Sequence, residues 1–374
     1  MTTIDEFIER FSEEPGYLDF ARRAPMGRTV RDEESAMSSL LGRARFGTLE
    51  TLDEQAARVQ AAVSALTGFR ADQVAFQPNT SQGLMHTMFG LTGEILLSPA
   101  EFPSNTFAVS RAADALGAVA PRWLETDHGR VTPGNIKRQL RPSTVAVEVS
   151  LVDYRTGYLV DLEGIRQVIG DRLLIVDAIQ GFGVVDAPFG VADVVVSGGQ
   201  KWTRAGWGTG FLALSDRAID RLTPVFSGFN ATTAEGMLLD EVPPPAAGAR
   251  AYSVSNPDPI AQARFAAALE ELAEVGVPAV HERVISATGR IIDLADEFGI
   301  PVVSSRNLAE RAGIVVVEPP GDQLTVLAAS MHNHGVSATR RGGTVRLSAH
   351  VSTTEETFEM LRASFLGFAS AITV

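Results

Sequence analysis

A regular alternation of short apolar segments and helix-like segments begins at residue 74 and limits the folds open to this chain. The apolar segments lie at residues 74–76, 95–97, 118–124, 145–152, 173–176, 194–196 and 211–214. Apolar strands separated by helices are typical of a mostly parallel sheet with helices on both faces. Such sheets bind ligands at the carboxyl ends of their strands, so the polar residues after each strand are candidates for chemistry.

The remainder of the chain predicts a second, smaller domain. Residues 220–256 contain Pro243-Pro244-Pro245 and little periodicity, which indicates a loop-rich crossing. After it we expect helices at 257–274, 278–298, 323–333 and 355–371, with strands at 314–317, 336–338 and 345–347. We therefore predict an α/β protein with a large domain at residues 45–250. The small domain comprises residues 1–44 and 251–374.

Composition excludes several classes of protein. The formal net charge is −13 over 374 residues, which argues against general nucleic-acid binding. No apolar run approaches the roughly 18 residues of a membrane span, and no signal peptide is visible, so a cytoplasmic enzyme is expected. The chain has no cysteine and therefore no thiolate nucleophile, and no histidine pair has convincing metal-ligand spacing.

Lys201 stands out because the chain has only two lysines, Lys137 and Lys201, against thirty arginines. It follows the predicted strand 194–196 after a Ser197-Gly198-Gly199 turn. Arginine stays protonated, whereas lysine can lose its proton and form a Schiff base. A solvated surface lysine is the alternative, but the position at a strand end among glycines and tryptophans argues against it.

An aspartate one strand earlier gives Lys201 a partner. The strand 173–176 runs directly into Asp177. A lysine and a carboxylate at the ends of adjacent strands suit pyridoxal phosphate (PLP), because the lysine holds the aldehyde and the carboxylate pairs with the pyridine nitrogen. Ala178 is small enough to lie under the ring. Alone, an aspartate at a strand end is as well explained by a turn or a helix cap.

Two segments together resemble a known family. Asp177-Ala-Ile-Gln180, followed by Ala192-Asp-Val-Val-Val-Ser-Gly-Gly-Gln-Lys-Trp202, is similar to the signature of the class V aminotransferases. That family belongs to the fold type I PLP enzymes and includes cysteine desulfurases, kynureninases and isopenicillin N epimerase. The resemblance implies a large domain with a mainly parallel seven-stranded sheet covered by helices, plus a smaller α/β C-terminal domain.

The same resemblance implies the cofactor contacts. Thr80 and Ser81 open a predicted helix, and a helix N-terminus with hydroxyl groups suits the PLP phosphate; a plain N-cap is the alternative. Ser197 and Gln200 match two further phosphate-contacting positions, with glutamine where histidine is usual. Gln180 matches the residue that hydrogen-bonds the ring hydroxyl.

Further matches concern the ring and the substrate. Phe102, in Glu101-Phe-Pro-Ser-Asn105, stands where many members stack a histidine on the ring; it can stack but cannot transfer protons. This phenylalanine and Tyr154-Arg-Thr-Gly157 are similar to kynureninases, which makes Tyr154 a substrate-binding candidate. Arg346 matches the arginine that binds the substrate α-carboxylate, as a guanidinium can with two parallel hydrogen bonds. The alternative for Phe102 is an ordinary aromatic packed in the core, and the alternative for Arg346 is a surface ion pair.

The resemblance also implies a homodimer with shared active sites, because in the family a loop of the second subunit completes the phosphate site. Residues 226–230 occupy the corresponding region, so Asn230 is a candidate cofactor ligand and Ser227 a weaker one. Three arginines are candidates for contact with an acidic substrate, with low specificity in a chain so rich in this residue: Arg22, Arg23 and Arg204. Arg340 and Arg341 are weaker candidates than Arg346 for the substrate carboxylate, and a solvated face is the alternative for both.

The predicted function is that of a PLP-dependent enzyme acting on an amino acid, with transamination as the family's broad default. A lyase or hydrolase that cleaves a C–S or C–C bond, kynureninase-like, and an epimerase remain alternatives. The lack of cysteine excludes a desulfurase that uses its own persulfide. A PLP-fold binding module is the non-enzymatic alternative. A nicotinamide dehydrogenase is disfavoured, because no Gly-x-Gly-x-x-Gly follows the first strand.

Overall fold

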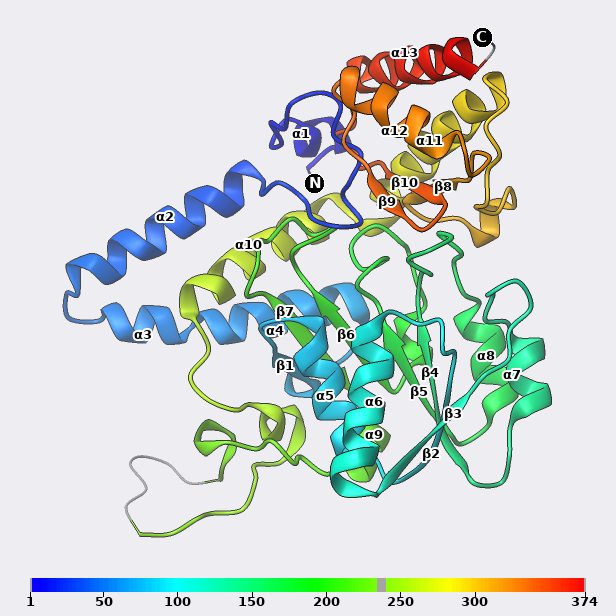
Figure 1. Cartoon of the computed structure of the whole chain (residues 1–374). Helices are drawn as coiled ribbons and strands as arrows, with labels where there is room; N and C mark the ends of the chain where they lie inside the picture. The colour runs from blue at the N-terminus through cyan, green and yellow to red at the C-terminus, as the bar shows by residue number, and fades with distance from the viewer. Residues whose placement is uncertain (1, 234–239, 373–374) are drawn as a thin grey trace.

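The fold centres on a seven-stranded sheet (Figure 1), seen in a computed structural model that describes residues 2–233 and 240–372. The strand order is β1 (Val74–Phe76), β7 (Gly210–Leu214), β6 (Val194–Gly198), β5 (Leu173–Asp177), β4 (Thr144–Ser150), β2 (Gly93–Leu97) and β3 (Val119–Trp123). Strand β7 runs antiparallel to both of its neighbours, whereas the pairings among β6, β5, β4, β2 and β3 are parallel. The predicted mainly parallel sheet is confirmed.

Helices cover both faces of this sheet, and the strands are apolar because both faces are buried. Val194 and Val196 of β6 pack with residues of α5 (Thr80–Gly90) and α6 (Pro103–Leu116). Val195 belongs to the opposite apolar cluster, with residues of α4 (Gln55–Thr67) and α10 (Pro259–Val275). Three shorter helices complete the layers: α7 (Pro133–Gln139), α8 (Leu162–Ile169) and α9 (Asp216–Arg221).

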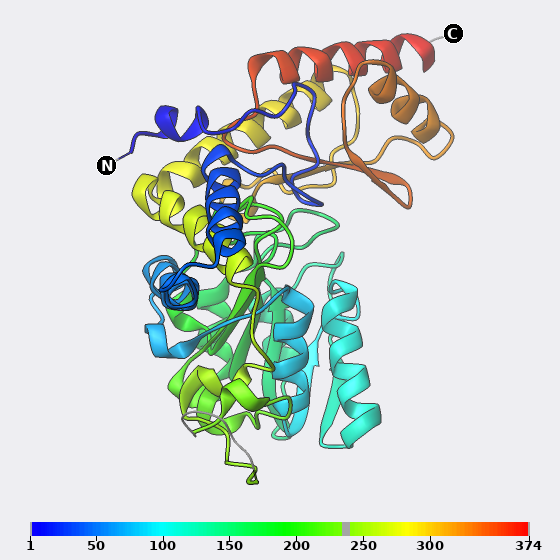
Figure 2. The ribbon, with the colours of Figure 1, turned by 90° about the vertical axis from the view of Figure 1, so that its left-hand side faces the viewer.

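A smaller unit lies at one end of the large sheet (Figure 2). Its antiparallel sheet has the order β8 (Ile314–Val317), β10 (Thr344–Ser348) and β9 (Thr339–Arg341). Helices α11 (Val277–Glu297), α12 (Leu324–Asn333) and α13 (Glu355–Ile372) pack with it. The strand predicted at 336–338 is wrong: β9 begins at Thr339, and Ser337 instead pairs with Tyr17.

The N-terminal segment joins the smaller unit to the large sheet. Asp19 forms a parallel bridge with Ser348 of β10, after α1 (Ile4–Ile8). Helix α2 (Arg28–Arg43) then packs on α10, and α3 (Thr48–Asp53) leads into α4. In Figure 1, α2 and α3 project from the body of the molecule. The division at residues 44 and 250 stays a prediction, although the first residues do lie against the C-terminal sheet.

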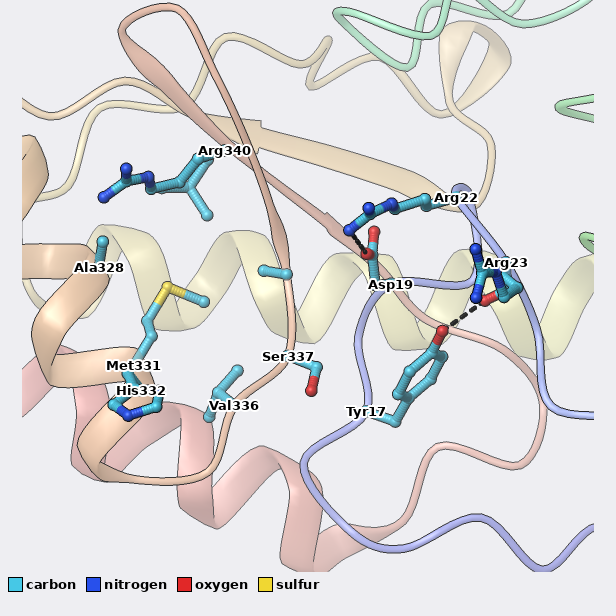
Figure 3. A pocket seen from close by; sticks show the side chains of 12 residues that line it. Tyr17, Asp19, Arg22, Arg23, Ala328, Met331, His332, Val336, Ser337 and Arg340 are labelled. Atoms are coloured by element: carbon cyan, nitrogen blue, oxygen red, sulfur yellow. Dashed lines mark hydrogen bonds and ion pairs between the residues drawn. The ribbon is translucent and has the colours of Figure 1, made fainter.

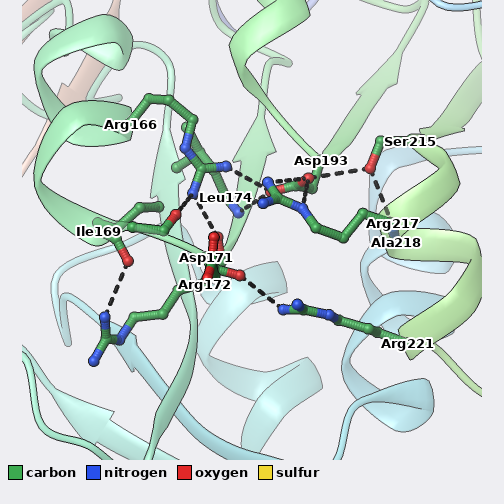
Figure 4. A network of polar contacts seen from close by, with 11 residues as sticks. Arg166, Ile169, Asp171, Arg172, Leu174, Asp193, Ser215, Arg217, Ala218 and Arg221 are labelled. Carbon is green, nitrogen blue, oxygen red and sulfur yellow. Dashed lines mark hydrogen bonds and ion pairs between the residues drawn. The ribbon is translucent and has the colours of Figure 1, made fainter.

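A network of charges ties the amino ends of two strands together (Figure 4). Asp193 precedes β6 and is 3% exposed. Its carboxylate accepts from Arg166 at 2.8 Å, from Arg217 at 2.6 Å and from the backbone N–H of Leu174 at 2.8 Å. Ser215 donates to the same group at 3.1 Å. Every oxygen of this buried carboxylate therefore has partners, and the network links α8, β5, β6 and α9.

Candidate active site

A cavity of about 230 Å³ lies at the carboxyl ends of β5 and β6, where the sequence predicted the chemistry. It is lined by Ala21, Arg22, Asn79, Thr80, Ser81, Phe102, Ser104, Asp177, Ile179, Gln200, Lys201 and Arg341. Six of the predicted cofactor residues are thus brought together by four separate segments of chain. Four other predicted positions do not line this cavity: Ala178, Gln180, Ser197 and Asn230.

Lys201 is buried in the cavity wall, only 8% exposed, just after the end of β6. Burial is the main cause that lowers the pKa of its amine to about 7; Arg346 and Arg341 act in the same direction, and Asp177 opposes them. Its Nζ lies 5.6 Å from the centroid of the Phe102 ring. A large share of the amine is therefore uncharged at neutral pH and able to attack a carbonyl carbon.

Asp177 ends strand β5 and is 1% exposed. Its Oδ2 accepts from Asn105 Nδ2 at 3.0 Å and its Oδ1 from the backbone N–H of Ile179 at 3.1 Å. Burial raises the pKa of this carboxyl, while the two hydrogen bonds and Lys201 oppose the shift. The sequence analysis gave Asn105 no role, although it lay within the 101–105 match.

Two further buried carboxyl groups lie near Asp177, one on strand β4 and one in the loop after β2, and the sequence analysis gave neither of them a role. Glu148 of β4 is 0% exposed, and neither of its oxygens has a hydrogen-bond partner within the described chain. Glu101 accepts from Ser150 at 2.5 Å, and burial raises its pKa to about 7. Burial, and then Glu101, raise the pKa of Glu148 well above its usual range. The raised pKa favours the neutral form of Glu148, which reduces the negative charge around Asp177.

The start of α5 forms the end of the cavity suited to an anion. Asn79 caps the helix by accepting from the backbone N–H of Gln82 at 2.9 Å, and Ser81 shares a 2.7 Å hydrogen bond with Ser104. The hydroxyl of Thr80 is buried and has no hydrogen-bond partner among the residues that the structure describes. The first turn of a helix also leaves backbone N–H groups free and carries a partial positive charge. These groups fit a phosphate.

Ser197 does not line this cavity, and its predicted contact with the phosphate stays a prediction. Side chains alternate along β6, so Gly198 rather than Ser197 lies opposite α5. A Cβ on Gly198 would stand 3.1 Å from the Thr80 hydroxyl and would collide with the Gln200 amide. The Ser197 hydroxyl instead donates to the Gly198 carbonyl at 3.3 Å. Glycine at 198 keeps this end of the cavity open.

Gln180 and Ala178 are buried behind the cavity wall. The side-chain oxygen of Gln180 accepts from Trp202 Nε1 at 3.2 Å, and its Nε2 donates to the Ala21 carbonyl at 2.9 Å. Trp202 and the N-terminal segment thus hold the amide in place, with one N–H left over. Ala178 is fully buried, and Ile179 rather than Ala178 lines the cavity. Their predicted contacts with the ring stay predictions.

A second cavity of about 510 Å³ contains the predicted substrate residues Tyr154 and Arg346. Arg346 is 2% exposed; its Nη1 donates to the Tyr154 carbonyl at 3.2 Å, and its Nη2 lies 3.8 Å from Asp19. Its Nε and Nη2 have no hydrogen-bond partner within the described chain. Burial lowers the pKa of this guanidinium to about 10, so it stays charged at pH 7 with donors free for a carboxylate.

Asn230 lies elsewhere, in a cavity of about 610 Å³ that also borders Tyr252 and Asn256. Its side-chain amide donates to the side chain of Asn256, and its carbonyl accepts from Arg250 at 3.2 Å. Within one chain Asn230 is therefore not part of the Lys201 cavity. The predicted cofactor contact of Asn230 depends on a second subunit and stays a prediction.

Two of the candidate arginines are already occupied within the protein. Arg204 is 1% exposed and pairs with Glu13 at 2.5 Å, while its guanidinium carbon lies 3.9 Å from the Phe11 ring centroid. Arg23 lies over the Trp207 ring at 4.1 Å. Arg204 is thus a structural residue that joins the loop after Lys201 to the N-terminal segment.

Two negative findings hold for residues 2–233 and 240–372. No group of three acidic, histidine or cysteine side chains is arranged to hold a metal ion. None of the helices there is both long enough and apolar enough to cross a membrane.

The chain belongs to the class V aminotransferase family, whose model matches residues 32–372. It is 28% identical over 281 residues to a kynureninase from Deinococcus radiodurans, a match that spans 71% of this chain and 66% of the relative. The chain therefore matches just under two thirds of that relative's length. The resemblance seen in the sequence is confirmed.

Solved structures share this fold. A cysteine desulfurase from Thermococcus onnurineus NA1 matches with a TM-score of 0.82 at 20% identity, over 93% of both chains. The cystine C-S lyase C-DES, in complex with its reaction product cysteine persulfide, matches with a TM-score of 0.84 at 18% identity, over 94% of this chain and 97% of the lyase. A mutant of C-DES with glycine covalently linked to the PLP cofactor has a TM-score of 0.85 at 17% identity, over 94% and 96%. The fold type I architecture is confirmed.

Proposed function

We propose that this protein is a PLP-dependent enzyme that transfers the amino group of an amino acid to a keto acid. The observation that carries the proposal is a buried lysine of pKa about 7 in one cavity with Asp177 and an unpaired helix N-terminus. Each end of PLP finds a matching group: Lys201 for the aldehyde, Asp177 for the pyridine nitrogen, and Thr80 and Ser81 for the phosphate. Phe102 lies within stacking reach of the ring.

The protein side chains then divide the work. When bound, PLP holds the substrate amino group and withdraws electrons from Cα. Asp177, fixed by Asn105, keeps the pyridine nitrogen protonated. Arg346 binds the α-carboxylate and so orients Cα toward Lys201. The Lys201 amine would serve as the base that accepts the Cα proton and gives it back.

The scarcity of bases in the cavity supports transamination as the proposed reaction type. Lys201, whose amine has a pKa lowered to about 7, and Asp177 both line the smaller cavity, and Asp177 is committed to the ring nitrogen. Phe102 replaces the histidine that many members place there and cannot transfer a proton. A single mobile base is sufficient for transamination, which moves one proton between Cα and the cofactor.

A second candidate is a hydrolase or lyase that cleaves a bond beyond Cα, as the kynureninase relative suggests. The specific observation in its favour is Tyr154, whose ring contacts Phe102 edge to face at 5.2 Å. A phenol at this place supplies the additional acid that such a cleavage needs. A homodimer is part of both proposals, because it would bring residues such as Asn230 of one subunit to the phosphate site of the other.

The test uses the two lysines of the chain as a matched pair. Purified protein should absorb as PLP enzymes do, and borohydride should fix the cofactor on Lys201, as mass spectrometry of peptides would detect. Lys201→Ala should abolish the fixed adduct and lower turnover by at least 1,000-fold. Lys137→Ala, on α7, should leave both unchanged. An intact adduct and full turnover in Lys201→Ala would refute the proposal.

The reaction type needs a separate measurement. A panel of amino acids should yield keto acids only when a keto-acid acceptor is added. Pyruvate, ammonia or anthranilate formed without an acceptor would reject transamination and favour the second candidate. In that case Tyr154→Phe should lower turnover strongly, whereas transamination should lose less than threefold.

A further inference from the structure

Arg341 lies where the two cavities meet. It lines both the 230 Å³ cavity that contains Lys201 and the 510 Å³ cavity that contains Arg346. It is the last residue of β9, and Gly342, with a φ of 53°, turns the chain back into β10. The tight hairpin therefore holds an exposed guanidinium over the junction. No ion pair to Arg341 exists among residues 2–233 and 240–372.

A line of packed side chains connects Arg341 to the lysine. Its guanidinium carbon lies 4.9 Å from the centroid of the Tyr154 ring. Tyr154 contacts Phe102 edge to face, and Phe102 lies 5.6 Å from Lys201 Nζ. A substrate bound with its Cα at Lys201 would therefore extend its side chain along these rings toward Arg341.

The charges around the junction are unbalanced in a chain with a net charge of −13. Asp19 is shared by two guanidinium groups, at 3.8 Å from Arg22 and 3.8 Å from Arg346. Asp177 faces Lys201. Glu318 lines the larger cavity, yet makes no ion pair with Arg341 in the described chain. One α-carboxylate on Arg346 leaves Arg341 without a counter-charge.

We infer that the substrate is an amino acid with a second anionic group on its side chain, and that Arg341 binds this group. The inference rests on the proposed function for the position of Cα, with Arg346 on the α-carboxylate. A guanidinium forms paired hydrogen bonds with a carboxylate, phosphate or sulfonate. The Tyr154 ring beneath it restricts the side chain of Arg341, which lowers the entropy lost on binding.

Arg340, which precedes Arg341 on strand β9, offers a matched control. Arg22 leads from the Lys201 cavity to an outer cavity of about 480 Å³, which Arg340 lines. Figure 3 shows Arg340 on the side of Ala328, away from the Arg22–Asp19 ion pair. Arg340 and Arg341 are neighbours on β9 with the same charge, but neighbouring side chains of a strand point to opposite faces. Of these two arginines, Arg341 lines the cavity that contains Lys201, and Arg340 does not.

The experiment compares kcat/KM for pairs of substrates that differ in side-chain charge: aspartate and asparagine, glutamate and glutamine, phosphoserine and serine. The protein should prefer the charged member of at least one pair by about 30-fold or more, less than for a fully buried ion pair because Arg341 is exposed. Arg341→Met should remove this preference with less than a threefold effect on the neutral member. Arg340→Met should retain it.

A binding measurement separates this inference from the proposed function. Calorimetric titration with glutarate and butyrate, which have no amino group to react, should show tighter binding of glutarate, lost in Arg341→Met. Protein that carries the Lys201 adduct but prefers no charged substrate, or loses the preference equally in both variants, would overturn the inference and leave the proposed function standing. Absence of the adduct would refute the proposed function itself.

Discussion

The two ends of strand β6 differ in whether their buried charged groups are paired. At the amino end, Asp193 accepts from two arginines, a serine and a backbone N–H (Figure 4). At the carboxyl end, Lys201 is buried with a lowered pKa, and the nearby Arg346 retains free donors. Burial of charge costs free energy in both places. At the amino end, ion pairs and hydrogen bonds offset this free energy, whereas at the carboxyl end they offset it in part.

Whether a buried charge has partners distinguishes structural residues from candidate site residues more clearly than its burial or its charge does alone. Arg204 and Arg346 are both almost fully buried, at 1% and 2% exposed. Arg204 has Glu13, Ser352 and two aromatic rings around it. Arg346 has one carbonyl and a shared aspartate at 3.8 Å. Buried polar groups that the chain leaves unpaired mark the place where a ligand supplies the partners.

We expect the largest effect from a substitution at the amino end of β6, where the charges are paired. Asp193→Asn leaves Arg166 and Arg217 without a counter-charge, and we expect a loss of about 3 kcal/mol in the free energy of unfolding. Urea denaturation would measure it. Asp114→Asn, which removes an exposed ion pair with Arg111, should cost less than about 0.5 kcal/mol. A stable Asp193→Asn protein with impaired chemistry would reverse the assignment of the two ends.

The pH dependence of cofactor attachment tests the unpaired end. With a pKa of about 7, the uncharged fraction of Lys201 rises roughly 50-fold between pH 5 and pH 7 and levels off above that. The rate at which cofactor-free protein attaches PLP should follow the same curve, as absorbance in a stopped-flow instrument would record. An ordinary lysine would give a rate still rising beyond pH 9, which would contradict the lowered pKa.

The smallest expected effect concerns two hydroxyl groups near the anion site. Thr80→Val removes a hydroxyl that has no partner within the described part of the chain, so PLP should bind about tenfold more weakly. Ser197→Ala removes a hydroxyl bonded only to its own loop, with less than a twofold effect expected. Equilibrium dialysis of the two variants compares them directly. Equal losses in both would mean that Ser197 reaches the phosphate after all.

The sequence analysis placed most elements within a few residues, because the strands are apolar on both faces and the helices begin at recognisable caps. Asp177 and Lys201 could be paired in advance, since both follow neighbouring parallel strands and such ends meet at one edge. The contact of Ser197 could not be judged. A shift of one residue along a strand moves a side chain to the other face of the sheet. Because Gly198 and Gly199 have no side chains, the sequence does not show on which face Ser197 lies.

Partners far apart in the chain were also beyond the sequence. Nothing local to Arg204 points to Glu13, and nothing local to Asp177 points to Asn105. An arginine in a list of thirty carries no sign of whether its charge is already satisfied. Arg341 and Arg204 were both weak candidates for that reason.

By itself the sequence determined the class of fold and the family, and it singled out the lysine proposed to hold the cofactor, because these depend on periodicity and on motifs contiguous in the chain. The tertiary structure decided which charges are paired and which are left free. Pairing depends on distances between residues far apart in sequence, and only the packed chain sets those distances. That distinction separates Asp193 from Asp177, Arg204 from Arg341, and one end of β6 from the other.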